Sequence, residues 1–367
     1  MNRVPVFDLK RAIETLAEPV EGRWRSLLGD GAFVGGEEVD RFERSFASFL
    51  DSAGCVGVAN GTDALMLALR ALDLRPGDEV IVPSFTFIAT AAAVVLVGGT
   101  PVFVDVEPAT LNIDLEKIPD RVTDRTVGMI GVHLYGRPFD VDQALELCSH
   151  RGLWLVEDAA QAHGATWNGK RVGNFGSLGT WSFYPSKNLG CFGDGGALTS
   201  NDADLLDRVR RLANHGRLEH YRHSEPGLNS RLDALQAAVL NCRLPSLDER
   251  NGRRRQISRM YREALVGVGD LRFLTDPAPA QSVYHQETVL TGRRDELRQH
   301  LDEQGVGTAV HYPLALHLQP AFATSARPNE NLDVAAAAGE EVLCLPMFPE
   351  LTDGEVERVC LAAQSFF

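Results

Sequence analysis

The stretch from Thr126 to Ala160, TVGMIGVHLYGRPFDVDQALELCSHRGLWLVEDAA, decides the fold class. Its two ends, residues 126–136 and 153–160, contain apolar runs rich in Val, Ile and Leu, and each run predicts a buried strand. Residues 141–152 between them predict a helix. A strand, a helix and a second strand in this order predict two parallel strands joined by a crossover helix.

The same alternation extends toward the N-terminus. Residues 10–50 read as helical, and the part that follows contains three apolar runs that predict strands. The glycine turn Asn60-Gly61-Thr62 begins a helix, for which Thr62 or Asp63 is the expected N-cap. We therefore expect an α/β fold whose mainly parallel sheet is sandwiched between helices. The predicted elements of this part are strands at 55–58, 79–83 and 101–106 and helices over 64–72 and 85–97.

The length of 367 residues predicts two domains of unequal size. Pro245 marks the expected end of a large domain, residues 1–245, which includes the N-terminal helical segment. Residues 247–265 predict a long connecting helix. The remainder mixes strand and helix signals, so residues 246–367 predict a smaller C-terminal α+β domain.

The charge balance and the cysteines restrict the classes of partner. The chain has 36 Lys and Arg against 50 Asp and Glu, a formal net charge of −14, which repels nucleic acid and anionic membranes. Its six cysteines are scattered, so we expect no disulfide scaffold and no metal site. The N-terminus carries no apolar signal core, and the longest apolar stretch is too short to span a bilayer. A cytoplasmic location is therefore predicted.

Three polar features follow or begin predicted elements. Asn60-Gly61-Thr62 opens a helix whose free N–H groups could bind a phosphate, although many glycine turns bind nothing. Asp158 follows an apolar strand, where ligands of α/β sheets bind, although it could equally cap a helix. Lys187 ends the predicted strand 179–187, and a desolvated lysine there becomes a nucleophile, whereas most lysines are solvated.

Together these features match the chemistry of pyridoxal 5′-phosphate (PLP). An amine can bond to the PLP aldehyde, a carboxylate can keep the pyridine nitrogen protonated, and a helix N-terminus can hold the phosphate. The sequence therefore predicts a PLP site that is built from Lys187, Asp158 and the turn at 60–62.

A series of longer motifs resembles one known family. In chain order the series resembles the nucleotide-sugar aminotransferases of the DegT/StrS family over nearly the whole chain. The resemblance implies fold type I of the PLP enzymes, the aspartate aminotransferase fold. The motifs are NGTDAL (60–65), VPSFTFIATA (82–91), PVFVDV (101–106), HLYG (133–136), EDAAQAHGA (157–165), SFYPSKNLGCFGDGGA (182–197), NSRLDALQAAVL (229–240) and HYPLALHLQP (311–320).

The resemblance also implies roles for individual residues. Lys187 would bond to the PLP aldehyde and move the proton, and Asp158 would hold the pyridine nitrogen. Gln161 and Phe87 would lie on opposite faces of the ring. Asn229 would reach the phosphate from a neighbouring subunit, which implies a homodimer with shared active sites. The residues implied at the phosphate are Gly61, Thr62 and Ser182, and those that could face substrate are Tyr184, His163, Arg231, His311, Tyr312 and His317.

The implied reaction is a ping-pong transamination. L-Glutamate would convert PLP to pyridoxamine 5′-phosphate, and a 3-keto hexose on dTDP or UDP would then receive the amino group. Two alternatives stay open at this point. Relatives that aminate a keto-cyclitol or serve in aminoshikimate-type synthesis share most of these motifs, and a non-catalytic regulatory or binding protein could retain the fold.

Overall fold

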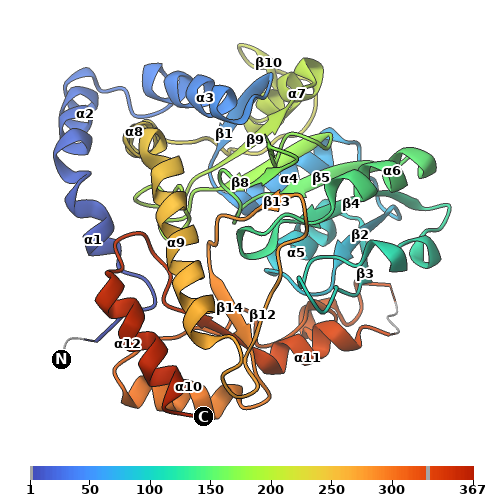
Figure 1. Ribbon diagram of the computed structural model, residues 1–367. Coiled ribbons are helices and arrows are strands. Elements are labelled where there is room, and N and C mark those ends of the chain that lie inside the picture. Colours follow the sequence, from blue (N-terminus) through green and yellow to red (C-terminus); the bar gives the residue numbers. More distant parts are fainter. Residues whose placement is uncertain (1–2, 328–330) are drawn as a thin grey trace.

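The computed structural model describes residues 3–327 and 331–367. Its centre is a sheet (Figure 1), which has seven strands. The strand order is β1-β9-β8-β5-β4-β2-β3. The five strands from β8 to β3 pair in parallel, and β9 runs antiparallel to both β8 and β1. The predicted mainly parallel α/β sheet is thus confirmed. The strands are β1 Gly54–Val58, β2 Glu79–Pro83, β3 Thr100–Val104, β4 Thr126–Val132, β5 Trp154–Asp158, β8 Leu178–Ser182 and β9 Gly196–Ser200.

Helices cover both faces of this sheet, because successive strand residues point to opposite sides. Met129 and Leu155 pack into one apolar cluster with α2, α3, α6 and α8, whereas Ile130 and Val156 pack into another with α4, α5 and α7. The strands can therefore be apolar throughout. The helices are α2 Ala17–Asp30, α3 Glu37–Leu50, α4 Gly61–Ala71, α5 Ala89–Val97, α6 Val141–Arg151, α7 Ala203–Ala213 and α8 Ala234–Arg243.

A second, smaller sheet, which contains β12 and β14, lies in the C-terminal part (Figure 1). Its strand order is β12-β14-β15. Its apolar residues pack with helices α9, α10 and α12, and Val4 from the N-terminal end joins the same cluster. The predicted division between residues 245 and 246 falls in the turn from α8 to α9 and stays a prediction. The elements are α9 Leu247–Leu265, β12 Arg272–Phe273, β14 Glu287–Leu290, α10 Arg294–Glu303, α11 Asp333–Glu341, β15 Val342–Leu345 and α12 Asp353–Gln364.

Several predicted boundaries were wrong. The strand predicted over 126–136 ends at Val132, because residues 134–136 form a 3-10 turn. Strand β8 ends at Ser182 rather than Lys187, because the chain turns at Pro185, which has no N–H to donate to a neighbouring strand. Helix α5 begins at Ala89, not Phe85. The N-cap of α4 is Asn60, whose extended backbone lets its side-chain oxygen accept from the Asp63 N–H at 2.8 Å.

No helix within residues 3–327 and 331–367 is long and apolar enough to cross a membrane. The predicted cytoplasmic location stays a prediction.

Candidate active site

Asp158 lies at the carboxyl end of β5, where parallel sheets bind ligands. Its side chain is buried, with only 6% of the residue surface exposed. One carboxylate oxygen accepts from Thr90 Oγ1 at 2.9 Å and the other from the Ala160 N–H at 3.2 Å. Burial raises the pKa of this carboxyl despite both bonds. A buried carboxylate with so few donors is suited to bind a protonated ring nitrogen.

Lys187 lies on the turn after β8, and its side chain is half-buried. Its Nζ atom donates to no residue that the structure describes. Burial lowers the pKa of this amine to about 8, and the negative charge of Asp158 acts in the opposite direction. The amine therefore loses its proton at a lower pH than an ordinary lysine, and the neutral form is the nucleophile.

The N-terminus of α4 provides free donors beside Ser182. Asn60 accepts hydrogen bonds from the N–H groups of Asp63 and Ala64, whereas the N–H groups of Gly61 and Thr62 donate to no described residue. A Cβ atom at position 61 would lie 2.7 Å from the Ser182 Cβ, so only glycine fits without displacement. Two free N–H groups at the positive end of a helix, next to a hydroxyl, fit a phosphate.

Gln161 and Phe87 lie near Tyr312. The Gln161 side-chain oxygen accepts from the Tyr135 N–H at 2.6 Å, and its amide donates to the Tyr312 hydroxyl at 3.2 Å. Phe87 is 51% exposed, and its ring centre lies 5.9 Å from that of Tyr312. Tyr135 adopts a positive φ of 59°, and its hydroxyl donates to the carbonyl of His311. Tyr135 thus links Gln161 to the C-terminal segment that carries His311.

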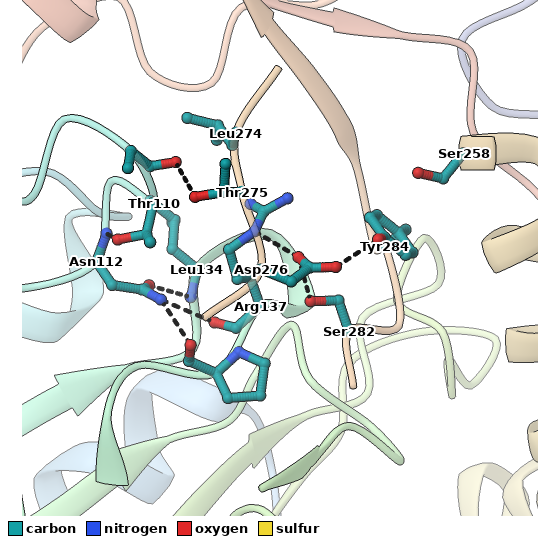
Figure 2. Close-up of polar contacts among 12 residues, drawn as sticks. Thr110, Asn112, Leu134, Arg137, Ser258, Leu274, Thr275, Asp276, Ser282 and Tyr284 are labelled. Atoms are coloured by element: carbon teal, nitrogen blue, oxygen red, sulfur yellow. Dashed lines mark hydrogen bonds and ion pairs between the residues drawn. The ribbon is translucent and has the colours of Figure 1, made fainter. Parts of the chain in front are cut away.

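Residues 274–285, which we call the strap, belong to the C-terminal part and contact the backbone of Tyr135. Figure 2 shows Asp276 of the strap surrounded by three donors: Arg137 Nε at 2.8 Å, Ser282 Oγ at 2.7 Å and the Tyr284 hydroxyl at 2.5 Å. The Arg137 charge helps to hold the pKa of Asp276 below its usual range, against the effect of burial. The strap also bonds to the backbone of residues 135 and 136. It therefore fixes the segment that positions Gln161.

The structure places the residues predicted to face substrate in different environments. His311 and Tyr312 are half-buried, and the charge of Lys187 contributes to lowering the pKa of His311. His163 is fully buried against Trp181 and Phe183. Burial lowers the pKa of its ring to about 3. His163 is therefore a core residue, and the charge of Lys187 contributes to lowering its pKa.

The other predicted residues lie farther toward solvent. Tyr184 is 56% exposed, and Asn229 and Arg231 are also exposed. His317 is half-buried, and the acidic groups that influence its pKa are Asp105 and Asp333 rather than Asp158. The catalytic, binding and substrate roles assigned to all these residues stay predictions.

Sequence reasoning missed two side chains at this site. The first is Thr90, which donates to Asp158. The sequence offers one signal for it, because Thr90 is the one hydroxyl residue in the apolar helix α5. His285 lies on the strap, and the charge of Lys187 contributes to lowering its pKa. Nothing local in the sequence around residue 285 points to a site almost one hundred residues earlier.

The amino-acid sequence matches a known family. The model of the DegT/DnrJ/EryC1/StrS aminotransferase family matches residues 16–364. The chain belongs to this family. It is 44% identical to a dTDP-3-amino-3,4,6-trideoxy-alpha-D-glucose transaminase from Streptomyces venezuelae, over 99% of this chain and 96% of that protein.

Two further similarities bear on substrate class and cofactor. The chain is 44% identical to a UDP-N-acetyl-3-dehydro-alpha-D-glucosamine 3-aminotransferase from Acidithiobacillus ferrooxidans, over 97% of this chain and 96% of that protein. The crystal structure of NtdA from Bacillus subtilis with bound cofactor PMP superposes with a TM-score of 0.93 at 30% identity, covering 100% of this chain and 85% of that chain. The fold is that of the fold type I PLP enzymes, as predicted, and the cofactor of this enzyme is PLP.

The residues of this structure fit that cofactor. A free amine of lowered pKa, a buried carboxylate with few donors, and two free N–H groups beside a hydroxyl match the aldehyde, the ring nitrogen and the phosphate respectively.

Replacing Gly61 with alanine should weaken PLP binding roughly 10-fold, because the added methyl group overlaps Ser182 and displaces the phosphate donors. The measurement is a PLP titration followed by absorbance. The control is Gly22→Ala in helix α2, where an added methyl group has no heavy atom within 4 Å. Equal affinity of Gly61→Ala and wild type would contradict the assignment of the phosphate site.

Proposed function

We propose that this member of the family transfers the amino group of L-glutamate to a 3-keto hexose on dTDP or UDP, by a ping-pong mechanism. The observation that carries the proposal is the free Lys187 amine close enough to the buried Asp158 to interact with its charge. Burial lowers the pKa of this amine, and the charge of Asp158 raises it. The two relatives described above support the substrate class, because both names specify an amino group at carbon 3 of a nucleotide-linked sugar.

When bound, PLP supplies an aldehyde for amines and a ring that accepts electrons from the substrate carbon. Asp158 would hold a proton on the ring nitrogen, and this proton increases the electron demand of the ring. The N–H groups of Gly61 and Thr62 and the hydroxyl of Ser182 would anchor the phosphate, with Gln161 and Phe87 beside the ring. The residues of this chain that would hold PLP are thus Gly61, Thr62, Phe87, Asp158, Gln161, Ser182 and Lys187.

Lys187 would have two tasks in succession. Its neutral Nζ would hold the cofactor through the PLP aldehyde. With the amino donor in that place, the same Nζ would accept the proton from the donor carbon and would then release it again. The reverse transfer with the keto-sugar completes the cycle. The ammonium form could do neither task, and the burial of Lys187 favours the neutral amine.

An assay with two acceptors tests the proposed substrate class. Purified protein with PLP and glutamate is supplied either with a 3-keto hexose on dTDP or UDP, or with a keto-cyclitol. Amination of the sugar nucleotide is the expected result. Amination of only the keto-cyclitol would overturn the proposed acceptor. A protein whose cofactor reacts with glutamate but which aminates neither acceptor would overturn it as well. No PLP-dependent turnover with any donor would favour a regulatory or binding protein.

The capture of PLP should depend on pH with a midpoint near 8. Burial disfavours the ammonium form of Lys187, so its proton leaves at a lower pH than the 10.5 of an ordinary lysine. The neutral fraction, and with it the rate of covalent capture, therefore rises as pH increases through about 8 and levels off above it. Stopped-flow absorbance between pH 6 and 11 measures this rate. A rate that keeps rising beyond pH 10 would contradict a desolvated amine.

We propose that the enzyme is a homodimer in which Asn229 completes the site of the neighbouring subunit. In the single chain the side chains of Asn229, Phe87 and Tyr184 are exposed, which leaves them accessible to a second subunit. Mixing inactive Lys187→Ala subunits with Asn229→Ala subunits should restore about a quarter of the wild-type sites, because half of the dimers are mixed and each has one intact site. No recovery after subunit exchange, shown by two differently tagged chains purifying together, would contradict a shared site.

A further inference from the structure

The side chain of Asn188, the residue after Lys187, is turned into the protein interior. Only 4% of its surface is exposed. Its amide Nδ2 donates to Asn251 Oδ1 at 2.9 Å and to the carbonyl of Val283 at 3.0 Å. Its Oδ1 lies 3.2 Å from Nδ1 of the His285 ring. Both amide hydrogens and the amide oxygen therefore have partners inside the protein.

Asn251 continues this network from helix α9. It is 1% exposed, and its Nδ2 donates to the carbonyl of His163 at 2.8 Å. Gly164 makes room for this bond, because a Cβ atom at that residue would lie 2.8 Å from Asn251 Nδ2. The glycine also has a positive φ of 88°, which other residues rarely adopt.

The two amides join four segments that are far apart in the sequence. These are the turn that carries Lys187, the loop after β5 that carries Gln161 and His163, the strap, and helix α9. A second contact fixes the same place, since Arg254 of α9 donates to the carbonyl of His285 at 3.2 Å. Buried and fully paired polar networks are rigid, and loosening one leaves unpaired groups at high cost.

We propose that Asn188 and Asn251 are positioning residues that hold Lys187 in its desolvated place opposite Asp158. This inference rests on the proposed function, since it takes Lys187 as the reacting amine. Lys187 has no hydrogen bond of its own through Nζ among the described residues, so its side chain is held by its backbone and its surroundings. The backbone next to it is fixed through the Asn188 amide.

The pair acts on Lys187 through position rather than charge, because both amides are neutral. The titratable groups whose charges interact with Lys187 are Asp158 on β5, His163 after β5, His285 on the strap, and His311. Burial lowers the pKa of all three imidazoles and so favours their neutral forms. Water that entered beside Lys187 would stabilise its ammonium form.

The experiment measures Lys187 itself, without turnover. PLP is added to apo-protein at a series of pH values, the capture rate is followed by absorbance, and the product is reduced with borohydride and mapped by mass spectrometry. The chain has four lysines, so the modified position is unambiguous. The variants are Asn188→Ala, Asn251→Ala and the double variant. The matched control is Asn241→Ala, which also loses two amide hydrogen bonds, both to Glu38.

The pH midpoint of capture should rise by about one unit in each single variant, as Lys187 becomes hydrated. The double variant should shift no further than the single ones, because the two amides act as one unit. Asn241→Ala should keep the wild-type midpoint. Unchanged midpoints in Asn188→Ala and Asn251→Ala, with stability lowered as in Asn241→Ala, would show a merely structural network and overturn the proposal.

If Asn251→Ala does not fold, Asn251→Leu provides the same test without adding a charge. Leucine keeps the size of the side chain but has neither the acceptor for Asn188 nor the donor for the His163 carbonyl, and we again expect a raised midpoint. An unchanged midpoint in that variant would overturn the proposal. The wild-type map separates the two claims: PLP on a lysine other than Lys187 would refute the proposed function, whereas PLP on Lys187 with unshifted variants would refute only the positioning role.

Discussion

Replacing Lys187 with alanine should reduce transamination by about 10³-fold or more while leaving the fold and non-covalent PLP binding in place. The variant lacks both the covalent attachment of the cofactor and the proton transfer, and each loss lowers the rate of transamination by a large factor. The phosphate donors of Gly61 and Thr62 and the carboxylate of Asp158 do not depend on the lysine, so the cofactor should still bind. Turnover is measured with glutamate and the keto-sugar nucleotide, and binding is measured by equilibrium dialysis.

The control for this variant is Lys170→Ala, since Lys170 lies exposed on strand β7 (Lys170–Arg171) and bonds to no described side chain. It should retain wild-type turnover. An added primary amine should restore part of the activity of Lys187→Ala, because it can carry out the proton transfer. Substantial activity of Lys187→Ala without any added amine would refute the assigned role.

Replacing Asp158 with asparagine should lower turnover roughly 100-fold, because an amide cannot hold a positive charge on the ring nitrogen. The amide keeps the size of the carboxylate and one oxygen for the Thr90 hydroxyl, so the fold should survive. Lys187 should still capture PLP, and because the charge of Asp158 raises the pKa of Lys187, the midpoint of capture should move to a lower pH. Steady-state kinetics and the pH profile of capture give the two values.

Asp140→Asn is a suitable control for the loss of one carboxylate. Asp140 caps helix α6 by accepting from the Gln143 N–H, away from Lys187. Its replacement should leave both turnover and the capture midpoint unchanged. If Asp158→Asn also retained wild-type turnover, another group would have to protonate the ring, and the assignment of Asp158 would fall.

The parts of the site that follow directly from local sequence could be predicted. The alternation of apolar runs and helices places Asp158 at a strand end and Gly61 at a helix start, and both positions are confirmed. Boundaries were less predictable, because they depend on a few backbone bonds. Asn60 rather than Thr62 caps α4, for example, since its extended backbone brings the side-chain oxygen to the Asp63 N–H.

The long-range parts could not be predicted from the sequence. Asn251 bonds to Asn188 only because helix α9 passes behind the Lys187 turn, and Asp276 reaches Arg137 only because the strap crosses from the C-terminal part. His163 stands two residues after Gln161 but points into the core, since the loop after β5 turns between them. Spacing along the chain does not contain this information.

The most direct test of the central claim is the visible spectrum of the protein with PLP, recorded before and after glutamate and again after the keto-sugar nucleotide. We expect a band from covalently bound PLP that disappears with glutamate and returns with the sugar nucleotide, because the two half-reactions interconvert two forms of one cofactor. A band that ignores glutamate would contradict the proposed amino donor, and the absence of any band with excess PLP would contradict Lys187 as the amine that binds the cofactor.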